Sequence, residues 1–391
     1  MQKNSMQLIT FLGLMLPCLL MSACASIKAV SPNEAHLTGA FIATRAEILV
    51  ATNRKRDDPP STSFSGERDV ETHLVGVTVS VPPRANRRPG QLKWSTSSKA
   101  NDEKVFHRVG MSELDKGDLE QWFLRHPQQQ SGHVFLFVHG YNTRFDPGIF
   151  LLSQLVTDTG VKAMPVLFSW PSRGKLLAYN YDRESAIYAR TALSEAIEDI
   201  SAVPEVTQIT ILSHSMGGWL TMESLRTLAL KHGTVPAKVR TVVLASPDID
   251  IYVFGEQFTS LETSGIDFTI LISKDDLALR AARWLGGNVD RMGRIDLKEA
   301  EYAELSRQSV VRVIDVSSIE TDAVLNHRKF AESPEIVGVL GRNLLNGQPL
   351  SDNDAGLLER LGVLIVGGTK AAVETVDDAR NQVKAAIDRS K

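Results

Sequence analysis

Short apolar runs that alternate regularly with helix-like segments are the sequence feature that most constrains the fold. From residue 133 onward six strand-length runs are almost continuously apolar: HVFLFVHG, AMPVLFSW, VTQITILSHS, VRTVVLASPD, DFTILISKDD and SVVRVIDVS. Such runs are typical of strands that are covered on both faces. Strands that alternate with helices favour a mostly parallel sheet between two helix layers. The sequence therefore predicts a three-layer α/β fold.

Two upstream runs and several helix signals extend this pattern. RAEILVAT (45–52) and HLVGVTVSV (73–81) are rich in β-branched residues, which brings the predicted sheet to eight strands. Asp146 and Pro147 predict the start of a helix, as cap and first-turn proline, and Gly160 predicts its end. Further helices are expected over 182–201 and 216–232, so residues 41–333 should form one domain with helices on both faces of the sheet.

The segment after Pro334 has a different pattern. It contains one short apolar run, Leu361–Val366, which is followed by a charged, helix-like tail. The run is too short to span a bilayer, because a spanning helix needs about 20 apolar residues. We therefore expect residues 334–391 to form a helical extension that packs on the domain or lies on its surface.

Composition excludes one broad class of function. Hydrophobic residues make up 43% and charged residues 23% of the 391-residue chain, as in ordinary globular proteins. The formal net charge is −3, so the chain lacks the basic field that is typical of nucleic-acid binding. No nucleic-acid partner is expected, and the sequence says nothing about oligomeric state.

The N-terminus has the pattern of a secretion signal. Lys3 precedes an apolar stretch over 8–20, and small residues follow it. The tetrapeptide MSAC, which ends at Cys24, resembles a bacterial lipobox with methionine in place of the usual leucine. We expect residues 1–23 to be a lipoprotein signal peptide and Cys24 to carry a lipid anchor. A plain signal peptide or an uncleaved anchor is the alternative.

A lipid anchor would place the protein in the bacterial cell envelope. Residues 24–40 would then form a linker between the membrane and the domain. Ala25 after the cysteine, rather than aspartate, favours the outer membrane by resemblance to such lipoproteins, so the domain is expected to face the periplasm. The only other cysteine, Cys18, lies in the signal, so the mature chain could form no internal disulfide.

Ser215 stands where a strand-like run meets a helix-like one. The pentapeptide Ser213-His214-Ser215-Met216-Gly217 resembles the G-x-S-x-G turn that exposes a nucleophilic serine between a strand and a helix, with serine in place of the first glycine. Small residues are needed there because the two backbones crowd together. An ordinary structural turn is the alternative, and the neighbouring residues must decide.

The run FLFVHGYN provides a first such neighbour. A His-Gly pair after an earlier strand is where this kind of site places a second donor for the oxyanion. The negative charge of a tetrahedral intermediate would then be held by the backbone N–H groups of Tyr141 and Met216. His139 is expected to shape the loop rather than transfer protons.

A general base should follow the serine in the chain. Only His232 and His327 do so. His232 is expected at the end of the helix that starts after Ser215, where it would interact with the helix dipole. By elimination and by chain order His327 is predicted to be the base.

Four aspartates could orient that histidine. Asp248 and Asp250 end one predicted strand, and Asp275 and Asp276 end the next. An acid is needed to accept the imidazole N–H and to stabilise the imidazolium. All four satisfy the chain order Ser, Asp, His; Asp276 is the preferred candidate and Asp248 the second.

Taken together, these motifs resemble the bacterial DUF900 family of α/β-hydrolases, a set of esterase- and lipase-like proteins. The resemblance covers roughly residues 45–330 and rests on ILVATNR, FVHGYNTRF, LFSWPSRG, YNYDRESA, LSHSMGG, LASPDID and ISKDDLAL, in family order. It implies the α/β-hydrolase fold, and it matches Asp276 to the family's acid and His327 to its late histidine. Here NHRKF stands where the family tends to have Gly-His and an aromatic residue.

The expected function is therefore a serine hydrolase that acts on carboxylic esters, of small molecules or lipids, through an acyl-enzyme. The sequence implies no metal or organic cofactor. An amidase, thioesterase or acyltransferase could use the same triad, because the fold does not fix the bond that is cleaved. A non-catalytic envelope lipoprotein that uses the hydrolase shell for binding is the alternative of another class.

Overall fold

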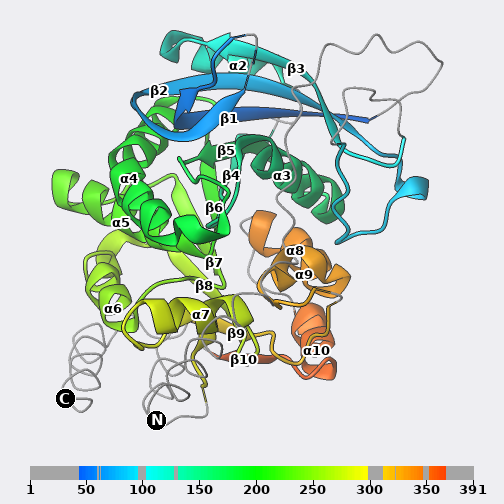
Figure 1. The fold of residues 1–391 in the computed structure, drawn as a ribbon, viewed down its shortest axis with the longest axis vertical. Helices are drawn as coiled ribbons and strands as arrows, with labels where there is room; N and C mark the ends of the chain where they lie inside the picture. Colours follow the sequence, from blue (N-terminus) through cyan, green and yellow to red (C-terminus); the bar gives the residue numbers. More distant parts are fainter. Residues whose placement is uncertain are drawn as a thin grey trace, which may run out of the picture.

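One sheet of ten strands runs through the whole molecule (Figure 1). The computed structural model describes residues 44–59, 61, 63–95, 103–126, 131–297, 311–321, 323–346 and 352–366. The predicted signal peptide, Cys24 and the predicted charged tail lie outside these ranges. The strand order is β10-β9-β8-β7-β6-β4-β5-β1-β2-β3.

The strands follow the apolar runs of the sequence. In chain order they are β1 (Thr44–Arg56), β2 (Phe64–Val81), β3 (His107–Leu114), β4 (His133–Val138), β5 (Met164–Ser169), β6 (Gln208–His214), β7 (Val239–Ala245), β8 (Asp267–Ile272), β9 (Val311–Asp315) and β10 (Leu364–Val366). The seven strands from β9 across to β1 are parallel, whereas β2, β3 and β10 pair antiparallel at the two edges. The mostly parallel α/β fold is confirmed.

The prediction of eight strands is wrong, because the sheet has two further strands, one at each edge. β3 has exposed or half-buried residues over most of its length, so it lacks the apolar run that marks a central strand. β10 lies within Leu361–Val366, for which a packing or surface helix was predicted, and it pairs with β9 from Leu364↔Asp315 to Val366↔Val313. Backbone pairing with a neighbour, rather than local sequence, makes both segments strands.

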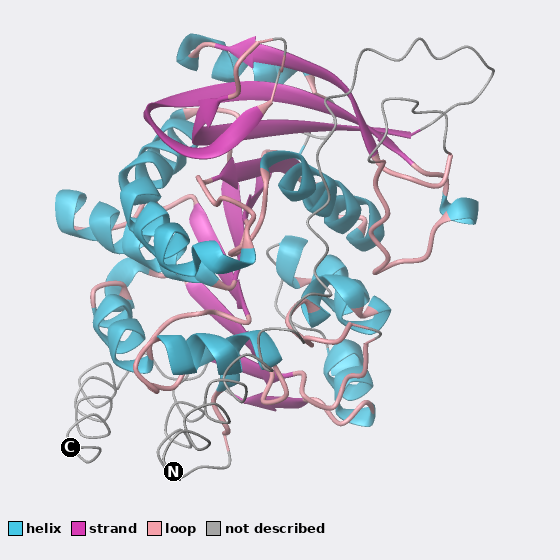
Figure 2. Cartoon of the chain, in the orientation of Figure 1, coloured by secondary structure: helices cyan, strands magenta, loops and turns pink. Residues whose placement is uncertain are grey.

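Helices cover both faces of the sheet (Figures 1 and 2). One face carries α4 (Tyr179–Ala202), α5 (Met216–His232) and α6 (Ile251–Thr259), and the other carries α3 (Phe145–Thr159), α9 (Pro334–Arg342) and α10 (Asp352–Arg360). The remaining described α-helices are α2 (Leu119–Arg125), α7 (Leu277–Leu285) and the short α8 (Lys329–Glu332). None of the helices in these ranges is long and apolar enough to cross a bilayer.

Helix ends agree with the sequence signals, with two differences. α5 spans the predicted 216–232 and stops at Gly233, which has a left-handed φ of 77°. α3 begins at Phe145, so Asp146 lies in its first turn and is not its cap. There the buried Asp146 pairs with Arg108 at 3.1 Å. α4 begins at Tyr179, and Asp182 likewise lies inside the helix.

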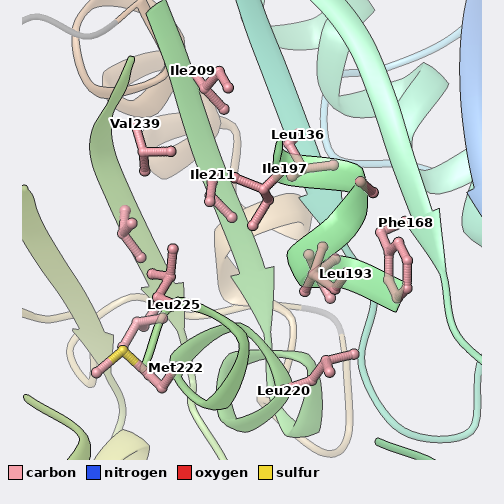
Figure 3. Close-up of a cluster of buried hydrophobic side chains, with 14 of the residues drawn as sticks. Leu136, Phe168, Leu193, Ile197, Ile209, Ile211, Leu220, Met222, Leu225 and Val239 are labelled. Atoms are coloured by element: carbon pink, nitrogen blue, oxygen red, sulfur yellow. The ribbon is translucent and has the colours of Figure 1, made fainter. Parts of the chain in front are cut away.

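Two apolar clusters enclose the sheet. On the α4–α5 side, Leu193 and Ile197 of α4 and Leu220 and Leu225 of α5 pack over β4 and β6 (Figure 3). The second cluster lies between the sheet and α3, α9 and α10. Since burying one leucine-sized side chain contributes about 1.5–3 kcal/mol, this two-sided core accounts for the continuously apolar strands.

The register of the parallel strands brings their carboxyl ends together. Val138 at the end of β4 pairs with Ser213, and Ser213 pairs with Leu244 of β7. Ala245 in turn pairs with Leu271 of β8. Loops after these strands therefore meet at one edge, where open α/β sheets place their ligand sites.

Candidate active site

Ser215 forms a strained turn between β6 and α5. Its φ is 53° and its ψ is −123°, a combination that costs a non-glycine residue of order 1–3 kcal/mol. The Ser215 N–H donates to the Ala245 carbonyl at 3.0 Å, and the Ser215 carbonyl accepts from Gly218 at 2.9 Å and from Asp248 at 3.1 Å. Main-chain bonds to β7 and α5 thus hold the turn from both sides.

Two glycines let the β4 loop approach this turn. A Cβ on Gly217 would lie 2.3 Å from the His139 carbonyl oxygen, and one on Gly140 would lie 3.0 Å from the Ser215 Cβ. Gly217 could hold a side chain only if the backbone moved, and Gly140 only if the His214 ring, whose Nδ1 would lie 2.6 Å from the added Cβ, moved away. The first position of the motif, Ser213, is fully buried. The loop with Tyr141, the predicted oxyanion donor, therefore lies beside the turn that carries Met216.

His327 and Asp276 are in direct contact. The His327 Nδ1 donates to Asp276 Oδ2 at 2.6 Å. The other oxygen of this fully buried carboxylate accepts from the Leu279 N–H at 2.9 Å, so Asp276 is also the N-cap of α7. Burial lowers the pKa of His327, but the Asp276 carboxylate, helped by that of Asp248, raises it, and the pKa ends above its ordinary value. Stabilising the imidazolium in this way is what a general base needs.

His214 connects the serine turn to the histidine loop. Its Nε2 donates to the His327 carbonyl at 3.0 Å, and the two ring centroids lie 4.6 Å apart. Burial holds the pKa of His214 well below its ordinary value, so it stays neutral. Within the described ranges no hydrogen bond joins Ser215 Oγ to His327; such bonds are often long in unliganded enzymes and tighten with substrate.

The second acid candidate, Asp248, has other partners. The Tyr179 hydroxyl donates to Asp248 Oδ2 at 2.8 Å, and Arg291 lies 3.4 Å from Oδ1. Burial raises the pKa of Asp248. Its charge still acts on His327 at longer range and helps raise the pKa of that histidine.

The remaining candidates are occupied elsewhere. Asp250 caps α6 by accepting from the Tyr252 N–H at 2.9 Å. Asp275 binds Lys329. His232 is the last residue of α5 and pairs with Glu198 on the surface.

A buried arginine organises the loop beside the site, and the sequence did not single it out. Arg54 of β1 is fully buried, and within the described part of the chain it donates to five uncharged acceptors: Ser169 Oγ, the carbonyls of Ser65, Thr143 and Ser172, and His139 Nε2. Burial lowers its pKa to about 9. Since loop arginines are usually solvated, only the ILVATNR run, which continues a strand into Arg54, could have indicated burial.

His139 and Asp182 complete this network. Burial and the Arg54 charge lower the pKa of His139 to about 3, so its neutral ring can accept from Arg54 while Nδ1 donates to the Gly140 carbonyl. The Asp182 carboxylate accepts from the Asn142 and Arg173 N–H groups. Trp170 packs on His139 and donates to its carbonyl at 2.7 Å. These contacts are structural, and they fix the loop that carries Tyr141.

No cluster of three or more metal-ligating side chains is found in the part of the chain that the structure describes. The arrangement at the sheet edge thus consists of a strained serine, a histidine, a buried carboxylate and main-chain N–H groups. Together these are the components of nucleophilic acyl transfer.

Known proteins resemble this chain to different extents. Residues 115–346 match the model of the family described as "Alpha/beta hydrolase of unknown function (DUF900)". An uncharacterized protein of Nostoc sp. (strain PCC 7120) is 29% identical over 122 residues, which cover 25% of this chain and 32% of that relative. The match thus spans about a third of the relative's length.

Solved structures also match. Lipase B of Aspergillus fumigatus aligns with a TM-score of 0.38 and 12% identity, over 66% of this chain and 63% of its own. A thermophilic carboxylesterase from a metagenomic library aligns with a TM-score of 0.29 and 12% identity, over 72% and 86% of the two chains. Because the family model covers more than half of the chain, including Ser215, Asp276 and His327, the protein belongs to the DUF900 family of α/β hydrolases.

Proposed function

We propose that this α/β hydrolase cleaves carboxylic esters through a triad of Ser215, His327 and Asp276. The observation that carries the proposal is the 2.6 Å bond from His327 Nδ1 to the buried Asp276 at the sheet edge where Ser215 adopts its strained turn. That bond fixes the tautomer that leaves Nε2 of His327 free of its proton and able to accept one from serine.

The reaction would follow from these positions. Nε2 of His327 takes the Ser215 proton while Oγ attacks the carbonyl carbon of the ester, and the leaving alcohol then takes that proton. Water hydrolyses the acyl-enzyme by the same route in reverse. The Met216 N–H, at the first position of α5, has no acceptor within the helix and lies where the helix dipole favours negative charge. With the Tyr141 N–H it would hold the oxyanion.

Covalent labelling tests the proposal. A fluorophosphonate should phosphonylate Ser215 Oγ of the detergent-solubilised full-length protein with loss of fluoride, and Ser215→Ala and His327→Ala should abolish labelling. A panel of p-nitrophenyl esters, anilides and thioesters then assigns the bond. A folded parent that is not labelled rules out an activated serine.

We further propose that the enzyme is tethered to the outer membrane through a lipid on Cys24, facing the periplasm. The support is the sequence pattern around this cysteine. Mass spectrometry of the mature N-terminus should find a diacylglyceryl cysteine, and Cys24→Ala should remove it. A mature chain that starts elsewhere without lipid would contradict the anchor.

A further inference from the structure

The Asp275 carboxylate binds the loop that carries His327 on both sides of the histidine. Asp275 Oδ2 accepts from Asn326 Nδ2 at 2.9 Å. Both oxygens of Asp275 accept from Lys329 Nζ, each at 2.9 Å. Asn326 precedes His327 and Lys329 follows it by two residues, so the loop is held across the catalytic position.

Lys329 also binds the segment that follows β9. Its side chain is 1% exposed, and Nζ also donates to the carbonyls of Val316 and Ser317, each at 3.2 Å, just after β9. Burying an ammonium group is costly unless it is paired and hydrogen-bonded. An apolar side chain would fill the same space without that cost, so the charge is best explained by the geometry it imposes.

The same loop has an unusual backbone. Asn326 adopts a left-handed φ of 53°, which turns the chain immediately before His327. The Leu325 carbonyl accepts from the Leu277 N–H at 3.0 Å, next to Asp276. The chain is therefore anchored to the end of β8 at Leu325, Asn326 and Lys329, and the His327 ring lies between the last two.

We propose that Asp275, Asn326 and Lys329 form a histidine clamp that positions the His327 ring on Asp276. The inference rests on the proposed triad and extends it: the three residues touch no reacting atom and act through His327. Asp275, an acid candidate by chain order, would thus serve the triad indirectly, while its neighbour Asp276 contacts the imidazole.

Three full-length variants test the clamp. Lys329→Met keeps an unbranched side chain, one atom shorter, but removes its charge, and Asn326→Gly removes the amide but tolerates the left-handed φ. Arg328→Met is the matched control, because Arg328 is exposed, lies between the two clamp residues and pairs with Glu332 instead.

We expect both clamp variants to slow fluorophosphonate labelling of Ser215 by about tenfold to a hundredfold, because misplacing a catalytic group by about 1 Å can cost about a hundredfold. The downfield proton resonance of His327 Nδ1 reports directly on its bond to Asp276. It should weaken in both clamp variants and persist in Arg328→Met, which should label at a rate near that of the parent.

The pH dependence of Ser215 labelling distinguishes a misplaced His327 ring from the mere loss of a nearby positive charge. Burial and the Arg328 guanidinium lower the pKa of His327, the Asp276 and Asp248 carboxylates raise it, and His214 beside it is neutral. Removing a nearby cation alone raises the pKa, whereas loosening the Asp276 contact lowers it. The acid limb of labelling should therefore move to lower pH in Lys329→Met and to higher pH in Arg328→Met.

The outcomes are distinct. If Lys329→Met folds, as judged by circular dichroism, and keeps the resonance and the parent labelling rate, there is no clamp. If it does not fold, Asn326→Gly decides by the same two measurements. If the parent protein is not labelled at all, the proposed hydrolase is wrong, while the resonance still shows whether the clamp holds His327 on Asp276.

Discussion

The two halves of the site are held in place by different means. Ser215 is fixed by main-chain hydrogen bonds to Ala245, Gly218 and Asp248, within the turn that leads from β6 into α5. His327 lies in a loop after β9, where side chains of Asp276, Asp275 and Lys329 make most of the contacts that orient it. One half depends on backbone geometry and the other on side-chain identity.

This difference determines which substitutions each half tolerates. Main-chain bonds survive most side-chain changes, so the serine turn requires small residues at Gly217 and Gly140 and little else. The histidine loop also has main-chain bonds, such as that from the Leu277 N–H to the Leu325 carbonyl, but the His327 ring is held by the Asp276 side chain, so removing one charge or one amide should loosen it. We therefore expect substitutions that keep the size of a side chain but change its charge to lower activity around His327. Around Ser215, we expect substitutions that enlarge a glycine to do so.

The largest expected effect is on the histidine side. Asp276→Asn keeps the size and the cap of α7 but replaces the oxygen that accepts from His327 Nδ1 with a donor, which favours the wrong tautomer. We expect kcat on a p-nitrophenyl ester to fall by about 10⁴-fold, as such a change does in serine proteases. Asp248→Asn is the matched control and should lose much less; a small loss in Asp276→Asn beside a large one in Asp248→Asn would show that Asp276 is not the acid.

On the serine side, Gly217→Ala should break the site by crowding. Its Cβ would lie 2.3 Å from a backbone oxygen, so the β4 loop must move away from Ser215. Since losing one oxyanion donor costs about 10²–10³-fold, we expect a fall in kcat of that order. Gly218→Ala, whose Cβ would come no closer than 3.2 Å to its nearest neighbour, the Pro247 side chain, should lose much less. Equal kcat values for the two variants would contradict the close approach.

Arg54→Met tests the support of the loop that bears Tyr141. The change removes the donor from five acceptors, three of them on fully buried residues, so we expect the free energy of unfolding in urea to fall by about 2–4 kcal/mol. Arg56→Met, two residues along β1 and half-exposed in an ion pair with Glu113, should change it by less than about 1 kcal/mol. Similar unfolding midpoints for both variants would show that the buried network contributes nothing.

The smallest expected effect is a shift in pH dependence. His327 must be neutral to accept a proton, and its pKa is raised by the Asp276 carboxylate against the effect of burial, so kcat/KM should fall as pH drops through a value above about 6.5. Asp248→Asn removes a weaker raising charge and should move this acid limb slightly to lower pH. A shift to higher pH would contradict the direction of that interaction.

Much of the fold was predictable because it depends on local pattern. The central strands are continuously apolar and the helix α5 ends at a glycine, and both follow from the sequence. β3 and β10 were not predictable in this way, since an edge strand needs only one neighbour and can remain largely exposed. The start of α3 was misplaced by two residues: Arg144 rather than Asp146 is the cap, and the buried Asp146 pairs instead with Arg108, which is distant in the chain.

Ser215 and His327 could be selected as candidates from the sequence by itself, because a strand-to-helix turn of small residues is a local pattern and few histidines follow it. Which of four aspartates meets His327 is decided only by the tertiary structure, since consecutive residues after a strand point in different directions and each finds a different partner. The burial of Arg54 and the hold of Asp275 on both sides of His327 also arise only there. Arg54 and His139 are 85 positions apart, and Asp275 lies 51 and 54 positions from Asn326 and Lys329. No local sequence pattern predicts contacts over such separations.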